Sequence, residues 1–377
     1  MKKMVLAYAV AVMLILVNSF AFALDVDFDY NVSKDYKQNL LSTTNLHTMY
    51  AVVGYGVEKG LLRISQENKF WQRGVEIIVD SQLAYGLTGL GHEGGHDYYA
   101  DRNGVGNRSI SWSFYNASTS YDLSYNNLAG LEKERISSAG LVWNNRAAEE
   151  SLVNRIGERA IISEMLWYSA NKISMPWYVK KSSAPNRTGS YGTSSNDMEN
   201  WTRHVAENDF GKMDSLYRDL KTGAVWQGLS LIAPAGASLY YLLTGKTYQI
   251  PKAWFSTEAE LTDAGVMYAL TGLYKHQGIT YSVRLGYGKN RVEERTMSQF
   301  EAEIRNVPLP LWDLRAKLKV GYTETLGASQ SFGIGLEKSF KQFAVGAEAN
   351  RYGGYHRNNP KATEGSTELL TYVNFKF

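Results

Sequence analysis

The chain has 377 residues, a formal net charge of +3 at pH 7 and no cysteine. The length is sufficient for two domains, since a typical domain takes roughly 100–200 residues. The lack of cysteine excludes disulfides, thiolate nucleophiles and thiolate metal ligands, and a nearly neutral chain argues against a nucleic-acid partner.

Residues 1–23 are expected to form a removed secretory signal. Lys2 and Lys3 give a positive start, Val5 to Val17 is an almost unbroken apolar run, and Ala21-Phe22-Ala23 is the small-x-small pattern that precedes a cleavage site. The apolar run is too short for a comfortable membrane span. We therefore expect an exported protein, with a retained N-terminal anchor as the alternative.

Residues 24–250 are predicted to form a mainly helical domain. Apolar residues recur at helical spacing in three stretches, about Phe70–Leu90, Leu131–Ala170 and Asp197–Leu243. Between the first two, Ser109 to Tyr125 looks extended. The apolar segment Gly223 to Leu243 could be a buried core helix or a helix lying against a membrane, and its length does not decide between them.

Residues 251–377 change to a period of two and are predicted to form about eight strands of roughly ten residues. In one of them Glu301, Glu303 and Arg305 alternate with the apolar Phe300 and Ile304. Such strands suit a tilted transmembrane sheet, which must close into a barrel because lipid cannot pair free backbone groups. A soluble antiparallel sheet is the alternative, because one wet face gives the same alternation.

The C-terminal residues resemble the assembly signal of bacterial outer-membrane barrels. Val373, Phe375 and the terminal Phe377 fall on alternate positions, and such barrels typically end in phenylalanine. The resemblance implies a location in the cell outer membrane, with its lipid as a partner. A barrel this small is filled by its own side chains, so the helical domain is expected outside the lumen, facing the periplasm.

A metal-binding pattern stands at residues 91–97, which read Gly-His-Glu-Gly-Gly-His-Asp. On a helix, His92 and His96 share one face and can hold one metal ion, with Glu93 beside it to accept a proton from water. Gly94 and Gly95 each cost about 1 kcal/mol relative to alanine in a helix. Metal binding or close helix packing must therefore compensate, unless the two histidines are unrelated surface residues.

The His-Glu-x-x-His pattern resembles the zincin metallopeptidases, and a later Glu-x-x-x-Asn resembles the gluzincin group among them. That resemblance implies Zn²⁺ held by His92, His96 and Glu150. Asn154 replaces the aspartate that hydrogen-bonds a ligand histidine in that group. Glu149 is the reserve third ligand, and both glutamates could instead be solvated helix charges.

The sequence thus predicts an α+β protein, a helical zincin-like unit followed by an antiparallel β-barrel of about eight strands. The resemblance implies a zinc-dependent peptidase of the outer membrane, acting on envelope proteins, with Glu93 as general base. His204 is the candidate oxyanion electrophile on residue type alone. One alternative is a non-catalytic outer-membrane protein with a structural or degenerate metal site, and another is a channel or transport barrel.

Overall fold

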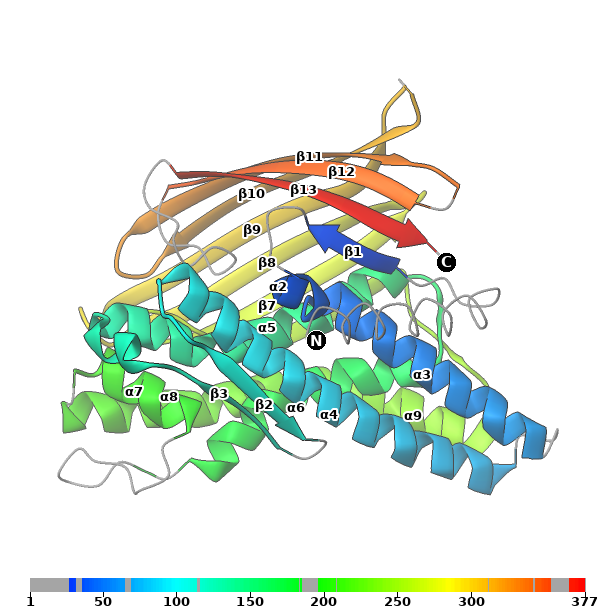
Figure 1. The fold of residues 1–377 in the computed structure, drawn as a ribbon, viewed down its shortest axis with the longest axis horizontal. Helices are drawn as coiled ribbons and strands as arrows, with labels where there is room; N and C mark the ends of the chain where they lie inside the picture. The colour runs from blue at the N-terminus through cyan, green and yellow to red at the C-terminus, as the bar shows by residue number, and fades with distance from the viewer. Residues whose placement is uncertain are drawn as a thin grey trace.

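The computed structural model describes residues 27–31, 36–64, 69–113, 116–182, 184, 196–207, 209–310, 312–341, 343–353 and 366–376. The expected secretory signal and Phe377 lie outside these residues, and the side chain of Phe375 is not described. Helices precede a large antiparallel sheet along the chain, so the α+β class is confirmed (Figure 1).

The three expected helical stretches are present, and two of them divide into shorter elements. Apart from the short 3-10 turns η2 (Leu123–Asn127) and η3 (Leu229–Leu231), the helices are α2 (Tyr36–Leu40), α3 (Thr43–Ile64), α4 (Phe70–Arg102), α5 (Gly130–Arg155), α6 (Ile162–Lys181), α7 (Asp197–Val205), α8 (Phe210–Gly228) and α9 (Ile232–Thr244). None of the helices in the described ranges is both long and apolar enough to cross a bilayer.

The sheet contains the eight expected strands and a ninth from the N-terminal region. Its order is β1-β13-β12-β11-β10-β9-β8-β7-β6, with antiparallel pairing throughout. The strands are β1 (Asp27–Asn31), β6 (Ala253–Leu261), β7 (Val266–His276), β8 (Ile279–Asn290), β9 (Arg295–Pro308), β10 (Leu314–Glu324), β11 (Ala328–Ser339), β12 (Phe343–Tyr352) and β13 (Ser366–Lys376). The described strands do not close into a barrel, because β1 and β6 do not pair.

Two small sheets stand apart from the large one. The segment expected to be extended forms a hairpin of β2 (Ser109–Ser113) and β3 (Asn116–Ser120), which packs on α4. β4 (Arg159–Ala160) pairs with β5 (Tyr248–Gln249). The N-terminal half therefore adds one strand, β1, to the described part of the large sheet.

The large sheet is charged on its concave face and apolar on its convex face. Arg284 is 1% exposed and donates to Glu258 at 2.6 Å and to Glu260 at 2.7 Å. Leu285, the next residue along β8, is 52% exposed. The alternation expected from the sequence is therefore present. The charged side chains point into the protein interior and the apolar side chains point outward.

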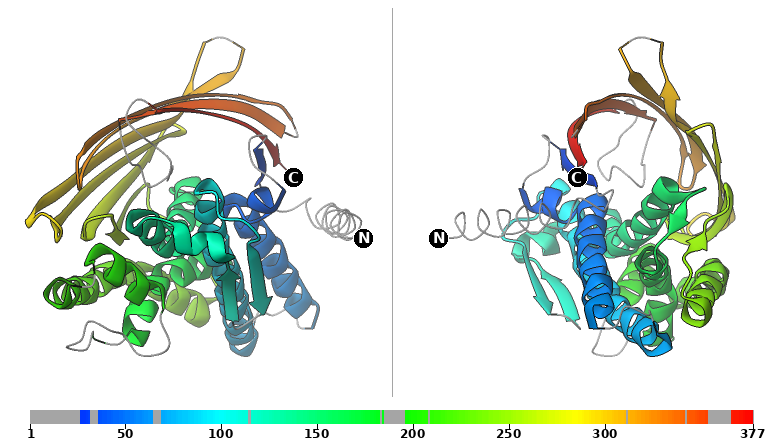
Figure 2. Two further views of the ribbon diagram at one scale, coloured as in Figure 1. Left: turned by 60° about the vertical axis from the view of Figure 1, so that its left-hand side comes forward. Right: turned by 90° about the vertical axis from the view of Figure 1, so that its right-hand side faces the viewer.

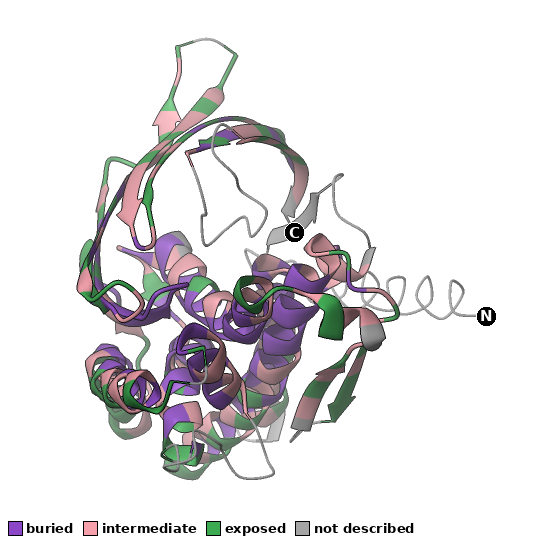
Figure 3. Cartoon of the chain, turned by 90° about the vertical axis from the view of Figure 1, so that its left-hand side faces the viewer, coloured by how far each residue is buried: buried purple, intermediate pink, exposed green. Residues whose placement is uncertain are grey.

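The helices lie on the concave side of the sheet, as the views along the molecule show (Figures 2 and 3). Lys172 of α6 forms a buried ion pair with Glu258 of β6 at 3.1 Å. Trp201 of α7 packs in one core with Ala259 and Val266 of the sheet. The prediction that the helical unit lies outside the lumen is therefore wrong, because helices and sheet bury their apolar residues against each other.

Close packing between α4 and α5 explains why α4 contains glycines, although glycine has a low helix propensity. A Cβ atom at Gly95 would lie 2.7 Å from the carbonyl oxygen of Ala139, and one at Gly91 would lie 2.0 Å from the ring of Trp143. From α5, a Cβ at Gly140 would lie 2.4 Å from Nε2 of His92. Close helix packing is thus the compensation that the sequence required, since no side chain fits at these contacts.

Replacing Gly95 with alanine should destabilise the fold by about 1–3 kcal/mol, because the added methyl meets the backbone of α5. Gly74→Ala in the same helix is the matched control, since no atom lies within 4 Å of its Cβ position. The control should raise stability by up to about 1 kcal/mol through helix propensity. Urea unfolding followed by circular dichroism measures both changes, and equal effects at the two positions would contradict the packing account.

Candidate metal centre

Two histidines on α4 face each other across a single short gap. The Nε2 atoms of His92 and His96 lie 3.1 Å apart, and both residues are 3% exposed. With Glu93, their ligand atoms lie within 4.8 Å of one another, close enough to hold a metal ion together. The expected pairing of the histidines is confirmed, since residues four apart lie on one helix face.

The other ring nitrogen of each histidine is held by an acceptor. His96 Nδ1 lies 2.6 Å from the carbonyl oxygen of Ile136, and His92 Nδ1 lies 2.7 Å from Oδ1 of Asn144. Asn144 in turn donates to Asn171 at 3.1 Å. A carbonyl can only accept, so Nδ1 carries the proton in both neutral rings and the Nε2 lone pairs face each other.

Asp197 supplies a third ligand atom, which the sequence analysis did not identify. Its Oδ2 lies 2.9 Å from Nε2 of His92 and 3.1 Å from Nε2 of His96. The residue begins α7, whose N-cap Asn196 accepts a hydrogen bond from the backbone N–H of Glu199. The side chain of Asp197 is 25% exposed, so solvent reaches the cluster from this side.

The three atoms match the donor set and spacing of a zinc site. Ligands bound to tetrahedral zinc at about 2.0–2.1 Å lie about 3.3 Å from one another, which is near the distances among these atoms. Burial lowers the pKa of His96, but the charge and hydrogen bond of Asp197 outweigh it and raise the pKa to about 9. For Asp197, burial acts to raise the pKa, yet the two histidines hold it well below its usual range. Without a metal ion the cluster therefore binds a proton between the two histidines and Asp197. A metal ion would take the same position.

Glu93 is positioned by the neighbouring hairpin. The hydroxyl of Thr119 in β3 lies 2.7 Å from Oε2 of Glu93 and 3.1 Å from its carbonyl oxygen. Glu93 is 7% exposed and does not contribute to the triangle formed by the histidines and Asp197. Glu93 lies close enough to the histidines to bind a metal ion with them, and a carboxylate fixed in this position can also accept a proton.

Two tyrosines complete the surroundings of the cluster. The ring of Tyr178 from α6 stacks on His92, with centroids 5.0 Å apart and planes 12° apart. Burial and then the charges of Asp197 and Glu93 raise the pKa of Tyr178 well above its ordinary value. Burial, Tyr125 and the same two carboxylates raise the pKa of Tyr121 as well. Both phenols stay protonated at neutral pH and can donate hydrogen bonds.

The structure places Glu150 away from the histidines, which corrects its assignment as a metal ligand. Its carboxylate accepts from Arg146 Nε at 2.8 Å and from the hydroxyl of Thr43. The α5 side chain that reaches His92 is that of Asn144. Position 150 lies six residues farther on, which is about 9 Å along the helix and about 120° around it. The expected partner of Glu150, the Asn154 side chain, lies outside the described residues.

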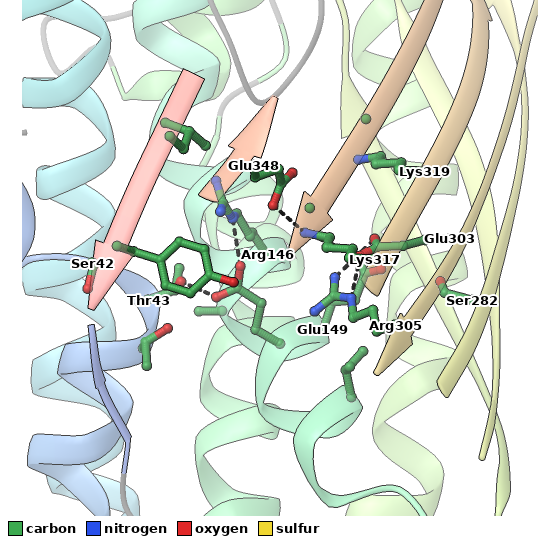
Figure 4. A pocket seen from close by; sticks show the side chains of 18 of the residues that line it. Ser42, Thr43, Arg146, Glu149, Ser282, Glu303, Arg305, Lys317, Lys319 and Glu348 are labelled. Atoms are coloured by element: carbon green, nitrogen blue, oxygen red, sulfur yellow. Dashed lines mark hydrogen bonds and ion pairs between the residues drawn. The ribbon is translucent and has the colours of Figure 1, made fainter. Parts of the chain in front are cut away.

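Glu150 and the reserve ligand Glu149 instead line a charged cavity between α5 and the concave face of the sheet (Figure 4). The cavity has a volume of about 720 Å³ and does not include the histidine cluster among its lining residues. Lys317 pairs there with Glu348 at 2.8 Å, and Arg305 pairs with Glu303 at 3.1 Å. A network of paired charges therefore lines the cavity, which is separate from the histidine cluster.

The structure does not bring His204 to the cluster. It lies seven residues after Asp197 in α7, which puts its Cα atom about 10 Å farther along the helix. Burial and the positive charges of Lys133 and Arg203 lower its pKa to about 4.

Sequence reasoning missed Asp197 because its signal was only a helix start. The run Asn196-Asp-Met-Glu199 reads as a capping box after a polar loop, which fixes where α7 begins. The capping-box pattern does not indicate which face of α4 the N-terminus of α7 will contact. Asn144, Tyr178 and Tyr121 had no sequence signal, because their roles come from packing between helices.

Metal content should follow the three atoms that the structure brings together. Zinc is the metal that we expect at this site. His96→Ala and Asp197→Ala should each bind much less zinc than the wild-type protein, because each removes one of three candidate ligands. Glu150→Ala is the control and should keep its zinc. Elemental analysis of the purified variants measures this, and zinc loss in Glu150→Ala alone would restore the sequence-based ligand set.

The metal-free protein should lose stability as pH rises through about 9. The pKa of His96 is raised from 6.5 to about 9 in the folded state, so its protonated form stabilises the fold fully below pH 6.5 and that contribution disappears above pH 9. Asp197→Asn should flatten this dependence by removing the charge that raises the pKa. Thermal unfolding after chelation, compared at pH 6 and pH 10, measures the effect, and a flat wild-type profile would contradict it.

No family model, curated protein or solved structure matches this chain. The likeness to zincins therefore rests on the His-Glu-x-x-His motif and on the geometry around it.

Proposed function

We propose that this protein is a zinc-dependent hydrolase of the outer membrane, with peptide bonds as its substrates. The observation that carries the proposal is the triangle of His92, His96 and Asp197, with Glu93 held beside it. Two buried imidazoles and one carboxylate are the ligand set of a catalytic zinc site, which leaves a coordination position open. Envelope proteins are the proposed substrates, in keeping with an exported chain.

Each residue of the centre has a distinct task in the proposed reaction. A zinc ion held there would polarise the scissile carbonyl and lower the pKa of an attacking water molecule to about 7. Glu93 accepts the water proton on its carboxylate and passes it to the leaving amine. Thr119 keeps that carboxylate in place through its 2.7 Å hydrogen bond.

The developing oxyanion needs a hydrogen-bond donor on the side opposite the histidine helix. Tyr178 lies against His92, and its pKa is raised partly by the charges of Asp197 and Glu93. We assign Tyr178 as this donor, with Tyr121 as the second candidate from the hairpin side. A phenol kept protonated at neutral pH donates without changing charge.

The outer-membrane location is supported by the polarity of the sheet. Ion pairs line its concave face while apolar side chains such as Leu285 and Phe332 are exposed on its convex face. A sheet in water shows the opposite polarity, since its solvent-exposed face is normally polar and its buried face apolar. Lipid is the solvent in which this arrangement is stable.

Glu93→Gln should reduce hydrolysis of a casein-type substrate by about 10²-fold or more, because the amide cannot accept the proton. Zinc content and circular dichroism should remain as in the wild type. Glu294→Gln, in an exposed ion pair with Lys289, is the control and should keep full activity. If neither the wild type nor the variant hydrolyses the substrate while both bind zinc, the site is structural and the hydrolase proposal fails.

A further inference from the structure

The free edge of the large sheet at β6 is covered by helix rather than by another strand. Gln227 of α8 accepts a hydrogen bond from the backbone N–H of Ala259 at 3.0 Å, and its amide group donates to the carbonyl of Lys172 at 2.8 Å. Asn145 donates to the carbonyl of Ala259 at 3.3 Å. Side chains thus satisfy backbone groups that a closing strand would otherwise pair.

Contact between α8 and the sheet is close along this edge. A Cβ atom at Gly223 would lie 2.9 Å from Cβ of Ala259 in β6. Trp226 donates to the carbonyl of Ala269 in β7 at 2.9 Å. The segment from α8 through η3 to α9 therefore continues the wall of the sheet.

The outward face of this segment is apolar from Gly223 onward. The 22 residues from Gly223 to Thr244 include no Asp, Glu, Lys or Arg. Val225 is 72% exposed, Ile232 69% and Leu243 63%. Phe255 of the adjoining β6 is exposed as well, so the apolar face of the helices borders that of the sheet.

The first half of α8 is charged, and the change occurs at the level where the sheet ends. Asp219 of α8 binds the guanidinium of Arg291 at 2.7 and 2.8 Å, and Arg291 stands in the turn between β8 and β9. On the helix side of this pair Asp214 and Arg218 are exposed, and on the sheet side Lys289 at the end of β8 and Glu294 in the turn are exposed. Helix and sheet therefore pass from charged to apolar surface at a common boundary.

We propose that Gly223–Thr244 contacts the acyl chains of a lipid bilayer and completes, with helix in place of strand, the lipid-facing wall begun by the sheet. An uncovered sheet edge is not stable in lipid, whereas a helix satisfies its own backbone groups. The common boundary at Asp219 and Arg291 marks the headgroup level, where charged side chains meet water. The inference rests on the proposed membrane location and adds that the helical unit shares the bilayer.

The chain has no cysteine, so single-cysteine labelling tests the proposal directly. Ile232→Cys and Val225→Cys are labelled with an environment-sensitive fluorophore, and the protein is reconstituted in phosphatidylcholine vesicles. Leu285→Cys on the convex face reports the sheet, and Arg218→Cys reports the charged half of α8. An unchanged circular dichroism spectrum shows that each labelled protein is folded.

Labels at positions 232 and 225 should be quenched by nitroxide-bearing lipid and protected from aqueous iodide, with the reverse at position 218. Iodide quenching at 232 and 225 together with lipid quenching at 285 would overturn the inference and leave the membrane location standing. Protection from both quenchers at 232 and 225 would also overturn it, because a protein would then cover this face. Iodide quenching at all four positions would reject the membrane location itself.

Discussion

The close contact between α4 and α5 holds the two histidines of the centre in their orientation, and the rest of the site depends on it. Gly91 and Gly95 allow the helices to approach, and Gly140 leaves room for the imidazole of His92. At this separation a backbone carbonyl and an amide of α5 reach both Nδ1 atoms. A larger helix spacing would free the rings to rotate, and the Nε2 atoms would no longer converge.

Because the two imidazole rings converge, a third group must offset the repulsion between their Nε2 lone pairs. Two imidazole lone pairs 3.1 Å apart repel unless a proton or a cation lies between them. Asp197 arrives from a helix that begins about a hundred residues later in the chain, and its carboxylate favours positive charge at that point. The candidate ligand atoms thus come from two helices, α4 and α7, and α5 orients the two imidazole rings.

The sequence predicted the features that follow from local period and failed for those that follow from packing. The period of two located β6 to β13, and the i, i+4 rule paired His92 with His96. The choice of Glu150 failed because a motif gives spacing along one helix but not the face that the helix turns to its neighbour. Alternation along the strands gave two faces correctly, yet it could not show that helices would occupy the concave one.

Helix α6 links the candidate centre to the sheet through two consecutive residues. Asn171 supports Asn144, which orients His92, while Lys172 forms the buried ion pair with Glu258 of β6. Adjacent helical residues point about 100° apart, so Asn171 can face α5 while Lys172 faces the sheet at the same height along α6. Burying the Lys172 charge is costly unless the Glu258 carboxylate remains in place, which ties the position of α6 to the interior of the sheet. A displacement of the sheet would therefore be transmitted to the histidine pair through a single turn of helix.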